Sequence, residues 1–265
     1  MKKHSMLTIA AALALAVLLG ACSGAAKTSN KLLVGTSADY PPYEFIILDD
    51  KNEQQYVGVD IELAKKLASD AGKELEIVNM NFDNLMVSLQ KGDIDAVIAC
   101  IEPNEERKQA GDFSDAYYVL NPPLVLIRTA DAGALTSVES LAGKNVGAQT
   151  GTTKADIVTD DIPDANLVAV ATVTDLVNQL SYDKVDAIVL DYDVAMSYAN
   201  SSPDFAIADI ELGIRQDLGV AVQKGDPKGL LPSFNKTIAA EKAAGNIDKW
   251  MEEANAISAD AIYPE

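Results

Sequence analysis

The segment "DNLMVSLQKGDIDAVIAC" (Asp83–Cys100) aligns without a gap with the segment 91 residues later, "TDLVNQLSYDKVDAIVLD" (Thr174–Asp191). In each copy, leucines four residues apart mark one face of a helix, and a charged turn leads into an apolar run rich in β-branched residues. Because these runs do not alternate with polar residues, they are typical of parallel strands covered on both faces. Chance similarity of two helix–strand units is the alternative. As a repeat, the pair predicts two α/β lobes with mostly parallel sheets.

Segments on both sides of the repeat fit this α/β plan. The runs "KLLVGTSADY" (31–40) and "KNVGAQTGTT" (144–153) each predict a short strand that ends in a polar loop. An apolar stripe through "VGVDIELAKKLASDAG" (57–72) predicts a helix that its final glycine terminates. The runs at 73–80 and 165–172 predict one further strand in each lobe. Together they indicate strands and helices in alternation, the pattern of an α/β fold.

The tail of the chain, residues 217–265, predicts a strand, a turn and helices, and is too small for a third domain. We therefore expect it to return to the first lobe. Lobe 1 would comprise residues 31–120 and 217–265, and lobe 2 residues 121–216. The chain would then pass between the lobes twice, in two parallel crossings that form a hinge and permit closure of the cleft.

The first 30 residues are not part of the predicted fold. A positive "MKK" start, an apolar run over residues 6–21 and small residues before Cys22 predict a signal peptide over residues 1–21. Residues 22–30 would form a flexible tether. The alternative is an uncleaved anchor helix. Both interpretations place the folded part outside the cytoplasm.

Composition excludes several classes of function. The chain has 40 acidic and 21 basic residues and a formal net charge of −19, which argues against nucleic acid and anionic lipid head groups as partners. The only histidine, His4, would leave with the signal peptide, so we expect no histidine-based hydrolase or metal site. Cys100 is the only cysteine besides Cys22, so no internal disulfide is expected. We predict neither a metal nor a cofactor.

Ligands of open α/β sheets bind beyond the carboxyl ends of the strands, which directs attention to the loops that follow strands. Residues 150–153, "TGTT", open a helix of the second lobe, where free N–H groups favour an anion. The other candidates by position are Ser37, Asp39, Tyr40 and Tyr43 after the first strand, Phe82 before the first repeated helix, and Cys100, Glu102 and Asp191 after the repeated strands.

Arg107 is one of only three arginines in the chain. Asn104 suits a helix N-cap, which places Arg107 in the first turn, where a cation costs about 0.3–1 kcal/mol. A guanidinium that grips a carboxylate through two hydrogen bonds would explain this position. The alternative is a surface arginine compensated by Glu105 and Glu106.

Five segments together resemble the polar amino-acid-binding proteins of bacterial ABC importers, the extracellular solute-binding family 3 with the type II periplasmic-binding, or Venus flytrap, fold. They keep the order of that family over nearly all of the mature chain: "VGTSADYPPYEF", "YVGVDIELAKKLA", "IDAVIACIEPNEERKQAGDFSDAYY", "VGAQTGTT" and "VDAIVLDYDVA". The resemblance implies a monomeric binding protein, not an enzyme, that captures a polar or cationic L-amino acid outside the membrane by hinge closure. It would deliver this ligand to the permease of an ABC transporter.

The N-terminus carries a second resemblance. The sequence Leu19–Cys22 is similar to a lipoprotein lipobox, in which the cysteine is lipidated, with palmitate among the acyl groups, and becomes the new N-terminus. This implies a lipid anchor at Cys22 that holds the protein at the outer face of the cell membrane or in the periplasm.

The family resemblance also implies roles for individual residues. Arg107 would bind the α-carboxylate of the ligand, helped by Thr152 and Thr153, and Asp191 would pair with the α-ammonium. Tyr40 and Phe82 match the aromatic or apolar walls around the ligand side chain. The alternatives are a solvated strand-end acid at Asp191 and ordinary core aromatics at the other two positions.

Glu102 and Ser37 depart from the pattern of the family. The family usually has Ser or Thr at the place of Glu102. Cationic amino-acid binders often have an acid at the place of Ser37, whereas this chain has Asp39 two residues later. Three interpretations of Glu102 stay open: a second acceptor for a cationic ligand, an ion pair with Arg107 that alters carboxylate recognition, or a solvent-exposed acid beside Pro103.

Two other classes of function compete with the binding protein. An enzyme on the same fold, similar to a dehydratase, would use Glu102 as a general acid or base. A ligand-sensing domain would bind the same kind of molecule and signal. The scarcity of histidine and of metal-ligand clusters disfavours the enzyme.

Overall fold

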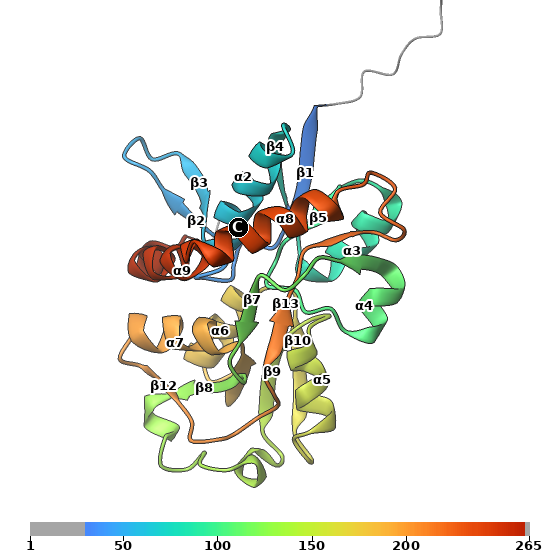
Figure 1. The fold of residues 1–265 in the computed structure, drawn as a ribbon. Helices are drawn as coiled ribbons and strands as arrows, with labels where there is room; N and C mark the ends of the chain where they lie inside the picture. Colours follow the sequence, from blue (N-terminus) through green and yellow to red (C-terminus); the bar gives the residue numbers. More distant parts are fainter. Residues whose placement is uncertain (1–29, 263–265) are drawn as a thin grey trace, which may run out of the picture. The chain divides into compact units, whose positions relative to one another are not determined.

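The computed structural model of the chain describes residues 30–262 (Figure 1). The predicted signal peptide, the lipidation site Cys22 and nearly all of the predicted tether lie outside the described residues. The compact unit described below begins at Lys31. Within residues 30–262, no helix is both long and apolar enough to cross a membrane.

Five strands form the first sheet, in the order β4-β1-β5-β14-β6. Strands β4 (Glu74–Asn79), β1 (Lys31–Thr36) and β5 (Ala96–Val97) run parallel, and β14 (Ala221–Gln223) and β6 (Gly111–Phe113) join antiparallel at one side. The tail thus contributes β14 to the sheet of the first half of the chain, as predicted.

The second sheet repeats this plan, in the order β10-β9-β11-β8-β12. Strands β10 (Asn166–Val170), β9 (Asn145–Gln149) and β11 (Ala187–Leu190) are parallel. Strand β8 (Leu124–Arg128) pairs antiparallel with β11, and the edge strand β12 (Phe205–Ile207) pairs antiparallel with β8. The prediction of two α/β lobes is confirmed, with mixed sheets built around a parallel half. Strands β8 and β14 are antiparallel because each enters its sheet from the hinge.

The repeat that predicted the fold is present in three dimensions. Helix α3 (Phe82–Lys91) precedes β5, and α6 (Val173–Ser181) precedes β11, at the spacing seen in the sequence. A glycine lies beneath each helix: a Cβ atom on Gly35 would be 3.0 Å from Leu85, and one on Gly147 would be 2.6 Å from Leu176. The two leucines are equivalent in the repeat, so both lobes use the same close approach of helix and strand.

The remaining helices cover the sheets or follow their strands. Helices α2 (Val59–Asp70), α8 (Leu231–Ala243) and α9 (Asn246–Ile257) contribute to one core cluster over the first sheet (Figure 1). The others are α4 (Glu105–Ala110), α5 (Thr153–Asp160) and α7 (Tyr192–Ser201), with the 3₁₀ turns Thr129–Asp131, Val138–Leu141 and Ser258–Asp260. A two-stranded sheet of β2 (Phe45–Leu48) and β3 (Gln54–Val57) projects from the first lobe.

The hinge consists of β7 (Tyr118–Leu120) and β13 (Gln216–Leu218), which lie side by side between the two larger sheets (Figure 1). They pair antiparallel, so the prediction of parallel crossings is wrong. The reason is topological: one crossing leaves the first lobe and the other returns to it. We propose lobe boundaries at 31–120 with 217–265 and at 121–216, which agree with sheet membership.

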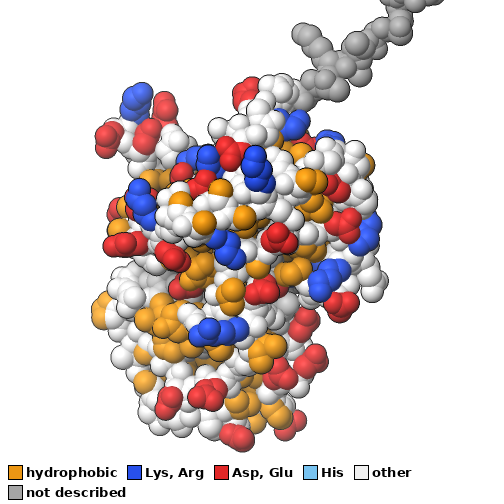
Figure 2. Space-filling view, viewed as in Figure 1, with side chains coloured by type: hydrophobic (Ala, Val, Ile, Leu, Met, Phe, Trp, Pro, Cys, Tyr) orange, Lys and Arg blue, Asp and Glu red, His pale blue; other side chains and the backbone are white. Residues whose placement is uncertain are grey.

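Acidic side chains dominate the charge of the chain, with 40 Asp and Glu against 21 Lys and Arg. Figure 2 shows red side chains spread over the visible face of the described part instead of gathered in one patch. On this face the negative charge is therefore spread and marks no single acidic docking site.

Candidate functional site

Four buried charged side chains meet where the two lobes face each other. Arg107 and Glu102 follow β5 in the first lobe, and Lys154 and Asp191 lie on α5 and after β11 in the second. Their exposed fractions are 7%, 3%, 3% and 2%, respectively. Buried charges are tolerated only when they are paired, so the partners of these four decide what the site can bind.

The four side chains form a row of alternating charge, which we call the charge row. Nη1 of Arg107 lies 2.7 Å from Oε2 of Glu102, and Nζ of Lys154 lies 2.6 Å from Oε1 of the same carboxylate. Nζ of Lys154 is also 2.7 Å from Oδ2 of Asp191. The middle ion pair, between Lys154 and Glu102, joins the two lobes.

Further hydrogen bonds hold the first-lobe end of the charge row. Arg107 donates from Nη1 to the backbone oxygen of Glu102 and from Nη2 to the backbone oxygen of Gly151, and both hydrogen bonds are 3.0 Å long. Its guanidinium lies 5.1 Å from the ring centroid of Phe82. The hydroxyl of Thr153 donates to Oε1 of Glu102 over 2.9 Å. Asn104 caps helix α4 by accepting a hydrogen bond from the backbone N–H of Arg107, as the sequence predicted.

The middle pair of the charge row, Glu102 and Lys154, is charged at neutral pH. Burial alone raises the pKa of Glu102, but Lys154 and Arg107 together lower that pKa to about 2. Burial lowers the pKa of Lys154, but the carboxylates of Asp191 and Glu102 raise it above its ordinary value. Burial raises the pKa of Asp191 against the opposing effect of Lys154. Each charge is therefore stabilised by a neighbour of opposite sign.

The second-lobe end of the charge row is held by the first lobe. The hydroxyl of Tyr40 donates to Oδ2 of Asp191 over 2.7 Å, and the thiol of Cys100 lies 3.7 Å from the same oxygen. Cys100 and Asp191 are the last residues of the two repeats, so the repeated strands end at one point. Cys100 has a positive φ of 45°, a strained conformation for a residue with a side chain.

A buried network beneath Cys100 holds this conformation. Asp60, in the first turn of α2, accepts a hydrogen bond from the backbone N–H of Cys100 over 2.6 Å and one from the hydroxyl of Tyr117 over 2.7 Å. Glu44 lies next to Asp60, and burial raises the pKa of Glu44 well above its ordinary value. Oε2 of Glu44 is buried and has no hydrogen-bond partner within residues 30–262.

Asp39 joins the two lobes at the other side of the site. Its Oδ2 accepts a hydrogen bond from the backbone N–H of Val173, the first residue of α6, over 2.7 Å, and its Oδ1 accepts one from the hydroxyl of Ser37 over 3.1 Å. Burial raises the pKa of Asp39 to about 6, although both hydrogen bonds oppose this shift. Asp39 is thus a titratable contact between the lobes.

We expect the protein to be more stable at pH 5 than at pH 7.5. Asp39 and Asp60 both have a pKa of about 6 in the folded protein, above the value near 3.9 of an unfolded chain. Their contribution is fully present below the unfolded pKa and is lost as the pH rises through 6. Glu102 acts oppositely, because its contribution is lost as the pH falls from about 4 toward 2. The free energy of unfolding should fall by about 1–3 kcal/mol between pH 5 and 7.5, at 1.36 kcal/mol per pKa unit.

Urea unfolding at the two pH values measures this difference. Asp39→Asn keeps an oxygen that can accept the N–H of Val173 but does not titrate, so its midpoint should change less with pH than that of the wild type. An equal or higher midpoint of the wild type at pH 7.5 would contradict the prediction.

Three cavities are lined by the charge row or by nominated residues around it. One, of about 300 Å³, is lined by Arg107, Phe82 and Thr152 among others. The other two are called the inner and the outer cavity. The inner one has a volume of about 10 Å³, enough for about one water molecule, and its lining includes Tyr40, Phe82, Lys154 and Asp191. The outer one has a volume of about 600 Å³ and shares Ser37 with the inner one. Its polar lining comprises Ser37, Asp39, Asn79, Asn81, Thr172, Thr174, Asp175 and Asn178. The space at Lys154 and Asp191 is nearly filled by side chains, and the larger open volumes are at Arg107 and around Asp39.

The structure brings together nearly all of the residues nominated from the sequence. Six line the inner cavity: Ser37, Tyr40, Phe82, Cys100, Thr152 and Asp191. Asp39 lines the outer cavity, and Glu102, Arg107 and Thr153 belong to the charge row or donate to it. The hydroxyl of Thr152 caps α5 and donates to the backbone oxygen of Gln149 over 2.7 Å. The roles of these residues toward a ligand stay predictions.

Three of the alternative interpretations are wrong. Arg107 is not a surface arginine, Asp191 is not a solvated acid, and Glu102 does not point to solvent, because all three are buried. The ion pair of Glu102 with Arg107 is present, and its effect on carboxylate recognition stays a prediction.

Sequence reasoning missed Lys154, Gln149, Glu44 and Ala99, which all line the inner cavity. For Lys154 a signal existed. It lies in the first turn of α5, where a cation is unfavourable, and the same observation had singled out Arg107.

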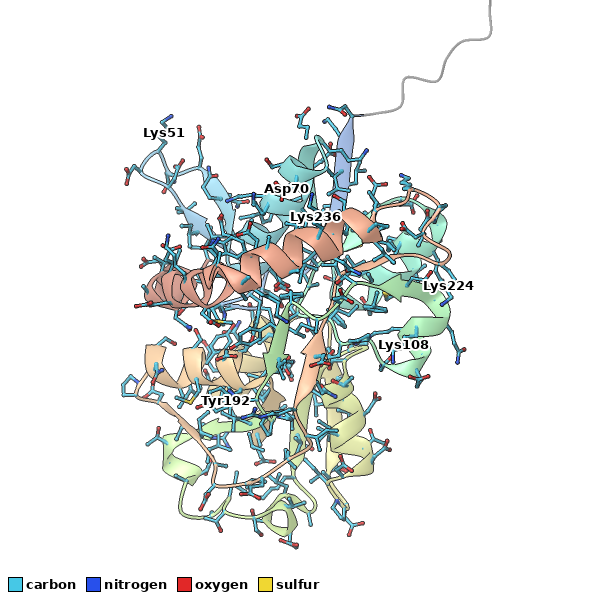
Figure 3. The ribbon with its side chains drawn as sticks, viewed as in Figure 1. Lys51, Asp70, Lys108, Tyr192, Lys224 and Lys236 are labelled. Atoms are coloured by element: carbon cyan, nitrogen blue, oxygen red, sulfur yellow. The ribbon has the colours of Figure 1, made fainter. Side chains whose placement is uncertain are left out.

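Comparison with known proteins places this geometry in a family. Residues 32–254 match the family of bacterial extracellular solute-binding proteins, family 3. The chain belongs to this family. The site described above lies within the matched residues, and so does Tyr192, labelled in Figure 3, which begins α7 directly after Asp191.

Relatives in this family are similar over nearly their whole length. The arginine-binding extracellular protein ArtP of Bacillus subtilis (strain 168) is 33% identical over 258 residues, covering 94% of this chain and 96% of that protein. ABC transporter arginine-binding protein 1 of Escherichia coli (strain K12) is 31% identical, covering 91% and 97%. The crystal structure of the amino acid ABC transporter substrate-binding protein AbpA from Streptococcus pneumoniae bound to L-arginine has a TM-score of 0.83 and 34% identity, covering 88% and 97%.

Proposed function

We propose that this protein is the extracytoplasmic substrate-binding component of an ABC importer, which closes its two lobes on an L-amino acid and delivers it to the membrane permease. One observation carries the proposal. A buried guanidinium, Arg107, and a buried carboxylate, Asp191, come from different lobes and are linked through Glu102 and Lys154 where the lobes meet. A zwitterion offers the opposite charge to each, and a ligand that contacts both lobes stabilises their closure.

The ligand that we propose is a cationic or polar L-amino acid, with L-arginine as the first candidate. ArtP and the AbpA complex are relatives for which arginine is named. The outer cavity shares Ser37 with the inner cavity, which Lys154 and Asp191 line, and its own lining includes Asp39 and Asp175. A long cationic side chain that extends from the row into this cavity would meet these two acids, which attract it electrostatically.

We propose a binding role without catalysis. Glu102 is the residue that the enzyme alternative needs as a general acid or base, and an efficient one has a pKa near the working pH. Two cations lower the pKa of Glu102 to about 2. It therefore stays ionised at neutral pH and is unsuited to exchange a proton with a substrate.

A lipid anchor at Cys22 and a monomeric state complete the proposal. The lipobox lies outside the described residues, so its support is the sequence "LGAC" alone. Mass spectrometry of the protein from a membrane fraction should find acyl groups on an N-terminal Cys22. A mature N-terminus other than Cys22 would refute the anchor and leave the binding function untouched.

A thermal-shift screen against the twenty amino acids, ornithine and citrulline tests the function. A ligand at about 100 times its Kd should stabilise the folded protein by about 2.7 kcal/mol. We expect the largest shift with arginine or another cationic amino acid. If none of these compounds raises the unfolding temperature at millimolar concentration, the amino-acid function is wrong.

A further inference from the structure

Both ends of the charge row already bind an opposite charge from within the chain. The guanidinium of Arg107 holds the carboxylate of Glu102 at 2.7 Å, and the carboxylate of Asp191 holds the ammonium of Lys154 at 2.7 Å. A carboxylate on Arg107 and an ammonium on Asp191 are the two contacts that a bound amino acid would make through its own charged groups. Glu102 and Lys154 thus take the places of the two groups of a zwitterion.

Glu102 and Lys154 are also partners of each other, at 2.6 Å. This third contact matters for what happens when a ligand enters. If the ligand carboxylate displaces Glu102 from Arg107, Glu102 keeps Lys154, and if the ligand ammonium displaces Lys154 from Asp191, Lys154 keeps Glu102. Exchange of partners therefore leaves every buried charge paired and moves no proton, which avoids the large penalty of an isolated buried ion.

We propose that Glu102 and Lys154 are specificity-determining residues. In the empty protein they form an internal ion pair that occupies Arg107 and Asp191, and a zwitterion displaces the pair from both residues when it binds. This inference rests on the proposed function and adds a competition to it. The ligand must displace the internal pair from Arg107 and Asp191, so the pair lowers affinity and holds the lobes together without ligand. It also selects for ligands that carry both charges, because the row has two positive and two negative members.

Charge counting predicts a distinct ligand for each variant. Glu102→Gln leaves two cations and one anion in the row, so it should favour a ligand with a carboxylate and no α-ammonium. Lys154→Met leaves one cation and two anions, so it should favour a ligand with an ammonium and no carboxylate. The double variant has one charge of each sign and lacks the internal competitor, so it should bind a zwitterion more tightly than the wild type.

Isothermal titration with three probes tests this set. The probes are L-arginine, the amine that results from its decarboxylation, and the 2-hydroxy acid that replaces its α-ammonium with a hydroxyl. We expect the double variant to bind L-arginine at least tenfold more tightly than the wild type, and each single variant at least tenfold more weakly than the double. The ratio of amine to arginine affinity should rise at least tenfold in Lys154→Met, and the ratio of hydroxy-acid to arginine affinity should do so in Glu102→Gln.

Lys108→Met is the matched control, because Lys108, labelled in Figure 3, is exposed and pairs with Glu105 on the surface although it follows Arg107 in the chain. It should leave all three affinities unchanged. Urea unfolding of each variant identifies a loss of binding that stems from a loss of folding. Small-angle scattering gives an independent readout: without ligand, the double variant should have a larger radius of gyration than the wild type.

The outcomes separate the inference from the function on which it rests. If the folded double variant binds L-arginine no more tightly than the wild type, or if the empty wild type is as expanded as the double variant, Glu102 and Lys154 are not a competing pair. If neither the wild type nor the double variant binds any amino acid of the screen, the proposed function itself fails.

Discussion

Replacement of Arg107 by alanine should lower the affinity for the amino-acid ligand at least about 100-fold. The ligand carboxylate would lose a buried guanidinium and would face the carboxylate of Glu102 instead. Truncation of one partner of a buried charged pair typically costs about 3–5 kcal/mol, which exceeds the 2.7 kcal/mol that corresponds to 100-fold. Isothermal titration of the wild type and Arg107→Ala measures the loss.

Two further variants make the result specific. Arg107→Lys keeps the charge but loses the planar fork that donates to Glu102 and Gly151, so we expect an intermediate affinity. Lys236→Ala removes an exposed cation of α8, labelled in Figure 3, that takes no part in the charge row, and it should bind like the wild type. Wild-type affinity in a folded Arg107→Ala variant would show that the carboxylate of the ligand binds elsewhere.

Replacement of Asp60 by alanine should destabilise the protein by about 3–5 kcal/mol. Asp60 is fully buried and accepts hydrogen bonds from the backbone of Cys100 and the hydroxyl of Tyr117. Without the carboxylate, both donors stay buried without a partner, at about 1–3 kcal/mol each. The positive φ of Cys100 would also lose the contact that holds it. The midpoint and slope of urea unfolding report this change in free energy.

Tyr117→Phe is the matched control for Asp60. It removes one hydrogen bond of the same network and leaves the contact with Cys100 intact, so it should cost about 1–2 kcal/mol. Asp60→Asn keeps an acceptor oxygen and should fall between the two. If Asp60→Ala unfolds at the same urea concentration as Tyr117→Phe, the network does not support the strained loop as we describe.

Prediction from the sequence succeeded where the signal was local. The repeat placed α3 with β5 and α6 with β11, because helix and strand periodicities are properties of short segments. Asn104 and Arg107 were placed correctly relative to each other because an N-cap acts within one helical turn. Strand direction was predicted less well: the hinge strands are antiparallel and the sheets are mixed, since direction depends on how the chain enters each sheet.

The charge row shows where local signals end. The sequence contains two acids and two bases at the right ends of the right elements, and it singled out Arg107, Glu102 and Asp191. It offered three interpretations of Glu102 and left Lys154 unnoticed. Contacts between the lobes decide which interpretation of Glu102 holds. Lys154 reaches Glu102 only after β5 and α5, which are far apart in the chain, have been brought face to face.

The sequence by itself therefore determines the two α/β units, their repeat and the set of polar residues at the strand ends, because periodicity, caps and turns act over a few residues. The pairing of those residues is settled by the tertiary structure. A buried charge is stabilised by whichever opposite charge lies within hydrogen-bond distance, and at this site the partners come from both lobes. We propose that the choice of ligand depends on that pairing, since an incoming zwitterion would have to replace Glu102 on Arg107 and Lys154 on Asp191.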